Sequence, residues 1–519
     1  MVNRGLCPVC GDLVLAEREE RDGRVLLVKH CPRCGRSEVL VSSDAERYRA
    51  KRGLDAEHEE PRGCALNCLT CTRKKSPGFV FVDITNRCNA NCPICINNTP
   101  AMGFLFEPPL DYFEKVFRFC ASLDPKPAVQ LFGGEPTVRR DLLDIIAMAR
   151  SYGLPTRVVT NGLRLADEDY CRRLVESRAT VLIAYDGANP RIYGVLRGNE
   201  KYLETKRQAL DNLRKLGARK VALMTCVAWG FNDEEMPELL RFCHDRRDFI
   251  RGVYFMPLAE TWSPEVLDLH PPRMTTEDIE HMVAACYPDT PVSFVPAGVI
   301  GGLHSLLGVL TDKRPPFAGA HPNCESMYLL LSDGERYLPV EHFLKGSIND
   351  AFADLIKVNE RFAALRGGQG KPRGLRGAYL RLRALLALTG LARRHLRVAA
   401  LMHGRGLGKV WHTVRLLAGL LTGGRSGELA RRHTRWGDVF QIGTLPERVR
   451  LLRPRRRPGP HCAGLRMGPV QDARYAPHRR PLRGPPSGSG LRGVAVHPSS
   501  PTARRALART GWHGPRRVL

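Results

Sequence analysis

Between residues 79 and 257 the hydrophobic pattern alternates between short β-rich runs and longer amphipathic stretches. The runs predict strands at 79–84, 128–132, 155–160, 179–185, 220–228 and 252–257. Helical spacing occupies the intervals 109–122, 139–152, 166–177, 202–216 and 234–246. Such alternation predicts a parallel sheet with crossover helices. Six units are too few for a closed eight-stranded barrel, so we expect a partial (β/α)6 barrel of the α/β class, with its chemistry at the carboxyl ends of the strands.

Composition changes along the chain predict six segments. They are metal knuckles at 1–45, a charged connector with a cysteine triplet at 46–76, the partial barrel at 77–260, an α+β continuation at 261–366, a basic helical region at 367–452 and a tail at 453–519. Leucine and arginine alternate in the helical region, which is typical of amphipathic helices with cationic flanks. Such helices either hold a protein to an anionic membrane leaflet or form a bundle with a solvated basic face.

The tail differs from the rest of the chain in charge and composition. Its 67 residues contain fifteen Arg, no Lys and one acidic residue, Asp472, so it carries about half of the formal net charge of +27. Because it lacks periodicity and is rich in Pro and Gly, we expect it to be disordered or translated out of frame. No apolar run approaches the about 18 residues of a membrane span, and no secretion signal precedes Cys7. A cytoplasmic protein is expected.

Seventeen cysteines in a reducing compartment favour metal ligation over disulfides. Near the N-terminus, Cys7-x-x-Cys10 and Cys31-x-x-Cys34 are each followed by glycine, which permits the positive φ of a tight knuckle turn. The two knuckles supply four thiolates for a Zn or rubredoxin-like Fe ion, and the apolar run 25–28 between them suits a hairpin. Six isolated cysteines are expected to be core or tail residues: Cys120, Cys171, Cys226, Cys243, Cys286 and, in the tail, Cys462.

Two cysteine triplets share one spacing. They are Cys64-x-x-x-Cys68-x-x-Cys71 and Cys88-x-x-x-Cys92-x-x-Cys95. The second triplet follows the first barrel strand, and three thiolates there can hold an iron–sulfur cube whose fourth iron has no protein ligand. The first triplet precedes the barrel, where we expect an auxiliary cluster or, alternatively, a second zinc site. Cys324, in a His-Pro-Asn-Cys setting, is a candidate additional ligand.

The second triplet resembles the signature of radical S-adenosylmethionine enzymes, and Gly133-Gly134-Glu135-Pro136 resembles that family's cofactor-binding turn. The resemblance implies a [4Fe–4S] cluster that binds S-adenosylmethionine and yields a 5′-deoxyadenosyl radical for hydrogen abstraction. We expect Gly133 and Gly134 to let the backbone approach the cofactor, and Glu135 to accept a hydrogen bond from its ammonium group. Asn161 and Asp186, after the third and fourth strands, are further candidate cofactor-binding residues. Alternatively, each is a common turn-forming residue with a purely structural role.

With the knuckles, the first triplet and Cys324 included, residues 1 to about 450 resemble a narrower group, the tetraether lipid synthases and their bacterial relatives. This resemblance implies carbon–carbon coupling of membrane lipid chains, a reductant such as ferredoxin or flavodoxin, and possible peripheral contact with the inner membrane face. Related sequences are also described as radical methyltransferases acting on a pterin, which is one alternative. Another is a non-catalytic zinc-ribbon protein that binds nucleic acid, but it leaves Gly133 to Pro136 unexplained.

Overall fold

The N-terminal part of the chain is a small antiparallel sheet followed by one helix. The computed structural model describes residues 3–54, 78–99, 102–123, 126–258, 267, 269–310, 325–366, 374–402, 405–421, 439–444 and 480–481. Within it, β1 (Asn3–Leu6), β2 (Leu13–Arg21), β3 (Arg24–Cys31) and β4 (Gly35–Ser42) pair in that order, and α1 (Ala45–Gly53) follows. Asp22 and Gly23 have φ of 52° and 70°, as a two-residue type I′ turn requires. The expected hairpin is confirmed.

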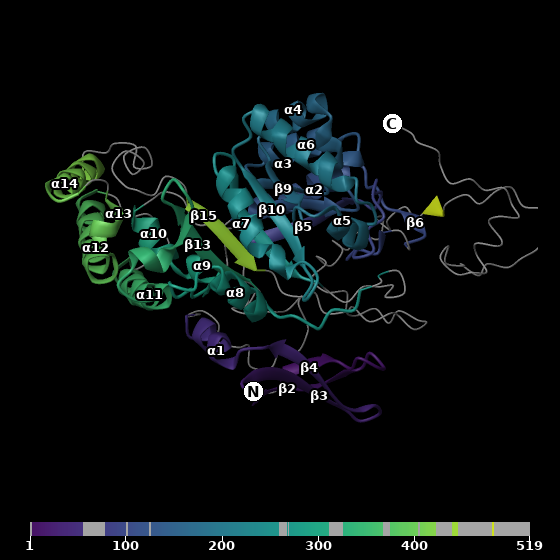
Figure 1. The fold of residues 1–519 in the computed structure, drawn as a ribbon, viewed down its shortest axis with the longest axis horizontal. Helices are drawn as coiled ribbons and strands as arrows, with labels where there is room; N and C mark the ends of the chain where they lie inside the picture. The colour runs from purple at the N-terminus through teal and green to yellow at the C-terminus, as the bar shows by residue number, and fades with distance from the viewer. Residues whose placement is uncertain are drawn as a thin grey trace, which may run out of the picture.

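The six expected barrel strands form one parallel sheet (Figure 1). They are β5 (Phe79–Thr85), β7 (Ala128–Gly133), β8 (Thr156–Thr160), β9 (Thr180–Ala184), β10 (Val221–Val227) and β11 (Ile250–Pro257). Their order across the sheet is their order along the chain, and every neighbouring pair is parallel. The partial barrel predicted from the hydrophobic alternation is therefore confirmed.

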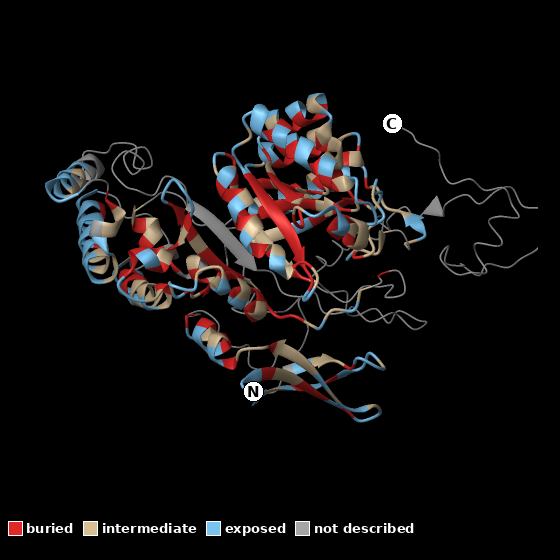
Figure 2. Ribbon diagram, viewed as in Figure 1, coloured by how far each residue is buried: buried red, intermediate tan, exposed pale blue. Residues whose placement is uncertain are grey.

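Helices cover one face of this sheet. The expected crossover helices are α2 (Leu110–Ser122), α3 (Leu142–Ser151), α4 (Glu168–Glu176), α6 (Tyr202–Lys215) and α7 (Met236–Asp245). Every residue of β10 is buried, as Figure 2 shows, because a parallel strand in the middle of a sheet has both faces covered. The predicted core cysteines Cys120, Cys171, Cys226 and Cys243 are buried, and Cys286 is half-buried.

Within the barrel, α5 (Pro190–Arg197) is absent from the sequence prediction, although the chain carries its boundary signals. The side chain of Asn189 accepts a hydrogen bond from the N–H of Arg191, and Pro190 is the first helical residue. Gly198 ends the helix with φ of 79°. Eight residues between two caps are too short for a periodic hydrophobic pattern to reveal, so only the caps could have predicted α5.

Strands from the C-terminal half extend the sheet beyond β11. β15 (Val439–Thr444) pairs parallel with β11, and β13 (Ser326–Ser332) pairs antiparallel with β15, with β12 (Val295–Pro296) and β14 (Tyr337–Pro339) beside β13. The sequence predicts only helices over 367–452, so β15 corrects that prediction. Its short apolar run forms a strand because backbone partners lie on both sides. β6 (Phe104–Leu105) and β16 (Arg480–Pro481) form a separate pair.

The remaining helices belong to the C-terminal half, where α8 packs on β11 and α10, α11 and α12 pack on one another. They are α8 (Thr276–Ala285), α9 (Val299–Gly302), α10 (His304–Leu310), α11 (Ile348–Arg366), α12 (Gly374–His395), α13 (Val398–Leu401) and α14 (Leu407–Leu421). Leu306 of α10, Phe362 of α11 and Leu380 of α12 share a small apolar core. Among the described helices, none has the length and hydropathy needed to cross a bilayer.

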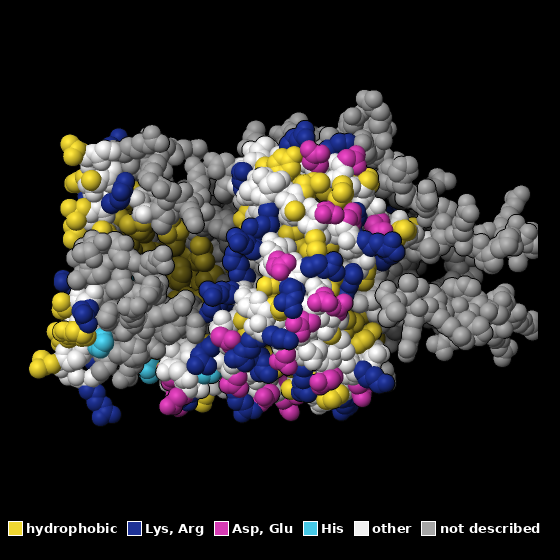
Figure 3. Space-filling model, turned by 90° about the horizontal axis from the view of Figure 1, so that it is seen from above, with side chains coloured by type: hydrophobic (Ala, Val, Ile, Leu, Met, Phe, Trp, Pro, Cys, Tyr) yellow, Lys and Arg dark blue, Asp and Glu magenta, His cyan; other side chains and the backbone are white. Residues whose placement is uncertain are grey.

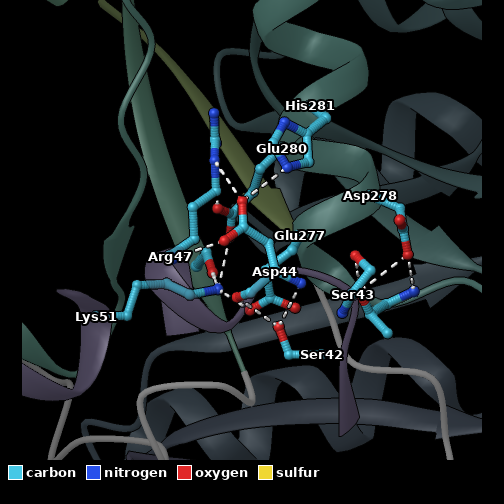
Figure 4. A network of polar contacts seen from close by, with 11 residues as sticks. Ser42, Ser43, Asp44, Arg47, Lys51, Glu277, Asp278, Glu280 and His281 are labelled. Atoms are coloured by element: carbon cyan, nitrogen blue, oxygen red, sulfur yellow. Dashed lines mark hydrogen bonds and ion pairs between the residues drawn. The ribbon is translucent and has the colours of Figure 1, made fainter. Parts of the chain in front are cut away.

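A buried ionic network joins the N-terminal unit to the C-terminal half (Figure 4). The Nζ atom of Lys51, on α1, lies 2.5 Å from Glu277 Oε1 and 2.7 Å from Glu280 Oε1, both on α8, and 3.1 Å from Ser326 Oγ. The three charged side chains are each 1% exposed. Burial alone would lower the pKa of Lys51, but the two carboxylates outweigh it and raise that pKa. The network fixes α1 against α8.

Candidate functional site

Four cysteine thiols gather at one end of the N-terminal sheet. The sulfur atoms of Cys7, Cys10, Cys31 and Cys34 all lie within 4.8 Å of one another, and the two knuckle glycines, Gly11 and Gly35, have φ of 77° and 80°. Backbone hydrogen bonds from Cys10 and Val9 lower the pKa of Cys7 to about 6. This thiol therefore releases its proton readily when a metal ion binds. Four thiolates at this spacing fit a tetrahedral Zn or Fe ion.

The second described cysteine group lies on the loop that follows β5. Cys88 is exposed, and Cys92 and Cys95 are half-buried. The loop is held at both ends, because the Nδ2 atom of Asn86 donates to the carbonyl of Phe104 at 2.6 Å and that of Asn97 donates to the carbonyl of Gly133 at 2.7 Å. The loop thus places its three thiols beside the carboxyl end of β7.

The Gly-Gly turn after β7 packs directly on the start of this cysteine loop. The N–H of Gly134 donates to the carbonyl of Thr85, and the N–H of Glu135 donates to the carbonyl of Arg87, both at 2.7 Å. A Cβ atom at Gly133 would lie 2.1 Å from the Thr85 oxygen, and one at Gly134 would lie 2.2 Å from the Arg87 oxygen. The glycines are therefore required where two pieces of backbone meet, immediately before Cys88.

The carboxylate of Glu135 is 1% exposed and accepts four hydrogen bonds. Its Oε1 atom accepts from the N–H and hydroxyl of Thr137, at 3.0 and 2.7 Å, and from the hydroxyl of Thr160 at 2.7 Å. Its Oε2 atom accepts from the N–H of Asn161 at 2.6 Å. Glu135 thus connects the carboxyl ends of β7 and β8, and its predicted contact with the cofactor stays a prediction.

Asn161 faces the cysteine loop from the end of β8. Its Nδ2 atom lies 4.0 Å from Cys88 Sγ and donates to Asn89 Oδ1 at 2.7 Å. From the other side, the ammonium of Lys206 donates to the carbonyls of Asn161 and Ala184, at 2.6 and 2.7 Å. Burial, followed by the positive charge of Arg197, lowers the pKa of Lys206 to about 8.

Sequence reasoning missed Lys206. The available signal is its position in α6, since it continues the buried stripe formed by Leu203, Ala209, Leu210 and Leu213. A lysine on the buried, otherwise apolar face of a helix needs hydrogen-bond acceptors on the sheet beneath that helix. The strand-end carbonyls of β8 and β9 are that target.

Asp186 lies at the end of β9 and is held within the protein. Both of its oxygens accept from Arg197, at 2.7 Å each, and Oδ1 also accepts from the N–H of Cys226 at 2.9 Å. Burial opposes ionisation of Asp186, but the charge and hydrogen bonds of Arg197, the charge of Lys206 and the N–H of Cys226 together outweigh it and lower the pKa of the carboxyl. Direct contact between Asp186 and a cofactor stays a prediction. Arg197 and Lys206 bring positive charge toward Cys92, where they oppose the rise in pKa that burial causes.

The sheet face that the helices do not cover carries a mixed apolar and polar surface. Val158, Val181 and Leu223 point to the helices, so residues one position along each strand point the other way. The apolar members of this opposite face are Val159, Leu182, Ala222, Met224, Tyr254 and Met256.

Polar groups join this second face. The guanidinium of Arg157 lies 4.4 Å from the ring centroid of Phe79. Burial raises the pKa of Tyr254, while the charge of Arg157 and a hydrogen bond from it oppose that rise. Burial also raises the pKa of Glu325 to about 7, again against the charge of Arg157. Arg157, Tyr254 and Glu325 are therefore a polar group beside an apolar wall.

Several predicted ligands lie outside the described residues. They are Cys64, Cys68, Cys71 and Cys324, and the tail after residue 452 is described only at 480–481. The predicted auxiliary cluster and the predicted disorder of the tail therefore stay predictions.

Two families match the chain. The family described as "Radical SAM superfamily" matches residues 82–243, which run from within β5 to within α7. The family described as "HMPTM N-terminal zinc ribbon domain" matches residues 3–43. The first match contains the Cys88 loop and the Gly-Gly turn, and the second contains both knuckles. The matched ranges thus coincide with the two cysteine sites of the described chain.

The chain is also similar to individual proteins. The 7,8-dihydro-6-hydroxymethylpterin dimethyltransferase of Methanocaldococcus jannaschii is 30% identical over 369 residues, which cover 68% of this chain and 72% of that protein. The GTP 3′,8-cyclase of Nautilia profundicola is 32% identical over 185 residues, so the chain spans 56% of the length of that cyclase. Among solved structures, SuiB of Streptococcus suis bound to S-adenosylmethionine has a TM-score of 0.35 and 16% identity, covering 40% of this chain and 46% of SuiB.

Proposed function

We propose that this chain, which belongs to the radical S-adenosylmethionine superfamily and to the group of the pterin dimethyltransferase, methylates a pterin or a similar flat heterocycle. The observation that carries the proposal is the 30% identity that extends over 72% of the pterin enzyme. The similarity to the GTP 3′,8-cyclase covers only 56% of that enzyme, so it supports a cyclase activity less well than the pterin enzyme supports methylation. Enzymes of this superfamily take a small-molecule substrate and a reductant.

The cysteine loop has the properties that the cofactor requires. Cys88, Cys92 and Cys95 would hold a [4Fe–4S] cluster, and the exposure of Cys88 leaves the loop accessible from solvent. When bound, the cluster and S-adenosylmethionine supply a 5′-deoxyadenosyl radical that removes a hydrogen atom. The chain itself fixes the loop against Gly133, Gly134 and Glu135 and keeps cationic groups beneath it. An external reductant, such as ferredoxin or flavodoxin, would provide the electron.

The sheet face opposite the helices suits a flat, polar-edged substrate. Met224 and Met256 can pack against a ring face, because their unbranched side chains adapt to flat surfaces. Arg157 and Glu325 can bind the polar edge of the same ring, one as donor and the other as acceptor. These assignments are part of the proposal.

The test is anaerobic incubation of the reconstituted full chain with dithionite, S-adenosylmethionine and 7,8-dihydro-6-hydroxymethylpterin. We expect 5′-deoxyadenosine, S-adenosylhomocysteine and a pterin that has gained methyl groups. Cys92→Ser should abolish all three products, and Cys286→Ser, a half-buried cysteine away from the loop, should retain them. If 5′-deoxyadenosine forms without any methylated pterin, the substrate proposal is wrong and the radical chemistry stands.

Coupling of lipid hydrocarbon chains is the second candidate. The observation that favours it is a surface of exposed leucines and arginines on α12 and α14. The same incubation with membrane lipid in place of the pterin tests it, and a coupled lipid product would replace the methyltransferase proposal. The non-catalytic nucleic-acid-binding alternative is not favoured, because it gives no role to the superfamily match over residues 82–243.

An auxiliary cluster at Cys64, Cys68 and Cys71 belongs to the same proposal. Iron and acid-labile sulfide should exceed one [4Fe–4S] cluster per chain after reconstitution. A triple replacement of these cysteines by alanine should return the content to one cluster, while the knuckle ion is retained.

A further inference from the structure

Two helices near the C-terminal end of the described chain carry large apolar side chains that face solvent. On α12, Leu375 is 92% exposed and Leu386 is 63% exposed, and on α14, Leu407 is 87% exposed. Further exposed apolar residues of these helices are Tyr379, Leu382, Leu385, Val410, Trp411 and Val414. Hydrophobic side chains gather at the left of Figure 3, the end at which Figure 1 draws α12 and α14. A set of this size indicates a binding surface.

The core does not account for this surface, because α12 uses its other face for packing. Leu380 and Ala384 are 2% and 0% exposed and contact the core formed with α10 and α11. Leu382, Leu385 and Leu386 point away from that core, at 57%, 48% and 63% exposure. A helix with apolar side chains on both faces has a second partner besides the core. A simple bundle with a solvated basic face therefore does not describe α12.

The charge beside these leucines has one sign. Residues 374–421 contain eight Arg, one Lys and no Asp or Glu. Arg383 lies over the ring of Tyr379, with its Cζ atom 5.6 Å from the centroid, and Arg415 lies over the ring of Trp411 at 4.1 Å. The cationic groups are thus interleaved with the exposed apolar side chains and can reach the same partner.

We infer that this surface of α12 and α14 docks on an anionic lipid bilayer and lies in its interface. The apolar side chains would enter the boundary between headgroups and acyl chains, and the arginines would contact lipid phosphates. Charge complementarity selects anionic over neutral lipid. A nucleic acid would use the arginines but not the leucines, whereas a bilayer uses both. The inference stands whatever the enzyme's substrate is.

Vesicle flotation of the full-length chain tests the inference. We expect binding to vesicles of phosphatidylcholine mixed with phosphatidylglycerol, and little binding to phosphatidylcholine alone. Leu382→Glu combined with Leu386→Glu should abolish binding. Arg383→Gln should weaken it about fivefold, since one surface cation contributes about 1 kcal/mol. The matched control is Phe119→Glu, which places the same charge at a 46% exposed apolar residue of α2 and should bind as the parent does.

Other occupants of the surface give different results. If the parent chain is a dimer that the double leucine variant converts to a monomer, and vesicle binding is unchanged, the surface binds a second copy and the inference is overturned. The inference would also be overturned if a DNA oligonucleotide competed fully with vesicles for the chain and the leucine substitutions left DNA binding intact. Unchanged circular dichroism of each variant shows that loss of binding is not loss of folding.

Discussion

The two cysteine sites of this chain differ in what holds them together. The knuckle site takes all four thiols from Cys7 to Cys34, on the turns of one small sheet, and their ligand atoms lie within 4.8 Å of one another. The Cys88 loop supplies three thiols, and its position depends on the Gly-Gly turn, on Asn161 at the end of β8 and on Lys206 from α6. A closed site can form locally, whereas an open, reactive site requires a scaffold assembled from several strands.

The largest expected effect comes from breaking the closed site. Cys31→Ser removes one of four ligands, and structural metal contributes about 10–16 kcal/mol to the folding of small zinc domains. We expect the knuckle ion to be lost and amide protons of β1 to β4 to exchange rapidly, with iron–sulfur content unchanged. Metal analysis and hydrogen exchange measure this, with Cys286→Ser as the control. Retention of the knuckle ion by Cys31→Ser would contradict a four-thiol site.

Lys51 tests how the two regions are joined. Lys51→Met removes the ammonium that Glu277 and Glu280 share and leaves Glu280 with the guanidinium of Arg47 at 3.5 Å. Removal of one partner from a buried ion pair costs about 3–5 kcal/mol. Urea unfolding should show that loss, and Glu277→Gln with Glu280→Gln added to Lys51→Met should recover much of it. Lys115→Met, at a lysine whose side chain is 56% exposed, is the control and should change stability little. Equal stability of Lys51→Met and the parent would show that the network does not fix α1.

Gly134→Ala tests the dependence of the open site on its scaffold. The added Cβ atom would lie 2.2 Å from the backbone oxygen of Arg87, so the turn and the cysteine loop must separate. A displacement near 1 Å can reduce catalysis about a hundredfold, and we expect 5′-deoxyadenosine formation to fall by that factor while the knuckle ion stays bound. Gly53→Ala, where a Cβ meets nothing within 4 Å, is the control. Parental activity in Gly134→Ala would mean that the turn does not position the loop.

The same contrast explains what the sequence could predict. Strands β5 and β7 to β11 and both knuckles follow from short-range patterns, such as apolar periodicity and Cys-x-x-Cys followed by glycine. The contacts that organise the open site are not local: Glu135 meets Asn161, and Lys206 reaches the carbonyl of Asn161 from 45 positions along the chain. Lys51 and Glu277 are 226 positions apart. A single sequence identifies these residues as charged and gives no information on which partner neutralises them.

The predicted role of the glycines shows the same limit. Their requirement for close backbone approach was predictable from the Gly-Gly pair, but the neighbour was not. The backbone that they approach in the structure is that of Thr85 and Arg87. The predicted approach to a cofactor is compatible with this packing, because the contact lies directly beside Cys88, and it stays a prediction.

The smallest expected effect concerns Lys206 and its pH dependence. Burial and Arg197 lower the pKa of Lys206 to about 8, whereas lysine in an unfolded chain titrates near 10.4. Between these pH values the unfolded chain binds a proton that the folded chain has released. This group therefore raises the free energy of unfolding as pH increases, by up to about 1.4 kcal/mol per pH unit.

Urea unfolding of the metal-free, reduced chain at pH 8, 9 and 10 measures this pH dependence of the free energy of unfolding. The charge of Lys206 also lowers the pKa of Cys92, so the difference between the parent and Lys206→Met reports the ammonium together with its effect on that thiol. Lys215→Met, at a lysine whose side chain is 66% exposed, should keep the parental dependence. Identical pH dependence in the parent and Lys206→Met would show that the ammonium is not desolvated beneath the cysteine loop, and that the open site lacks the buried cation we assign to its scaffold.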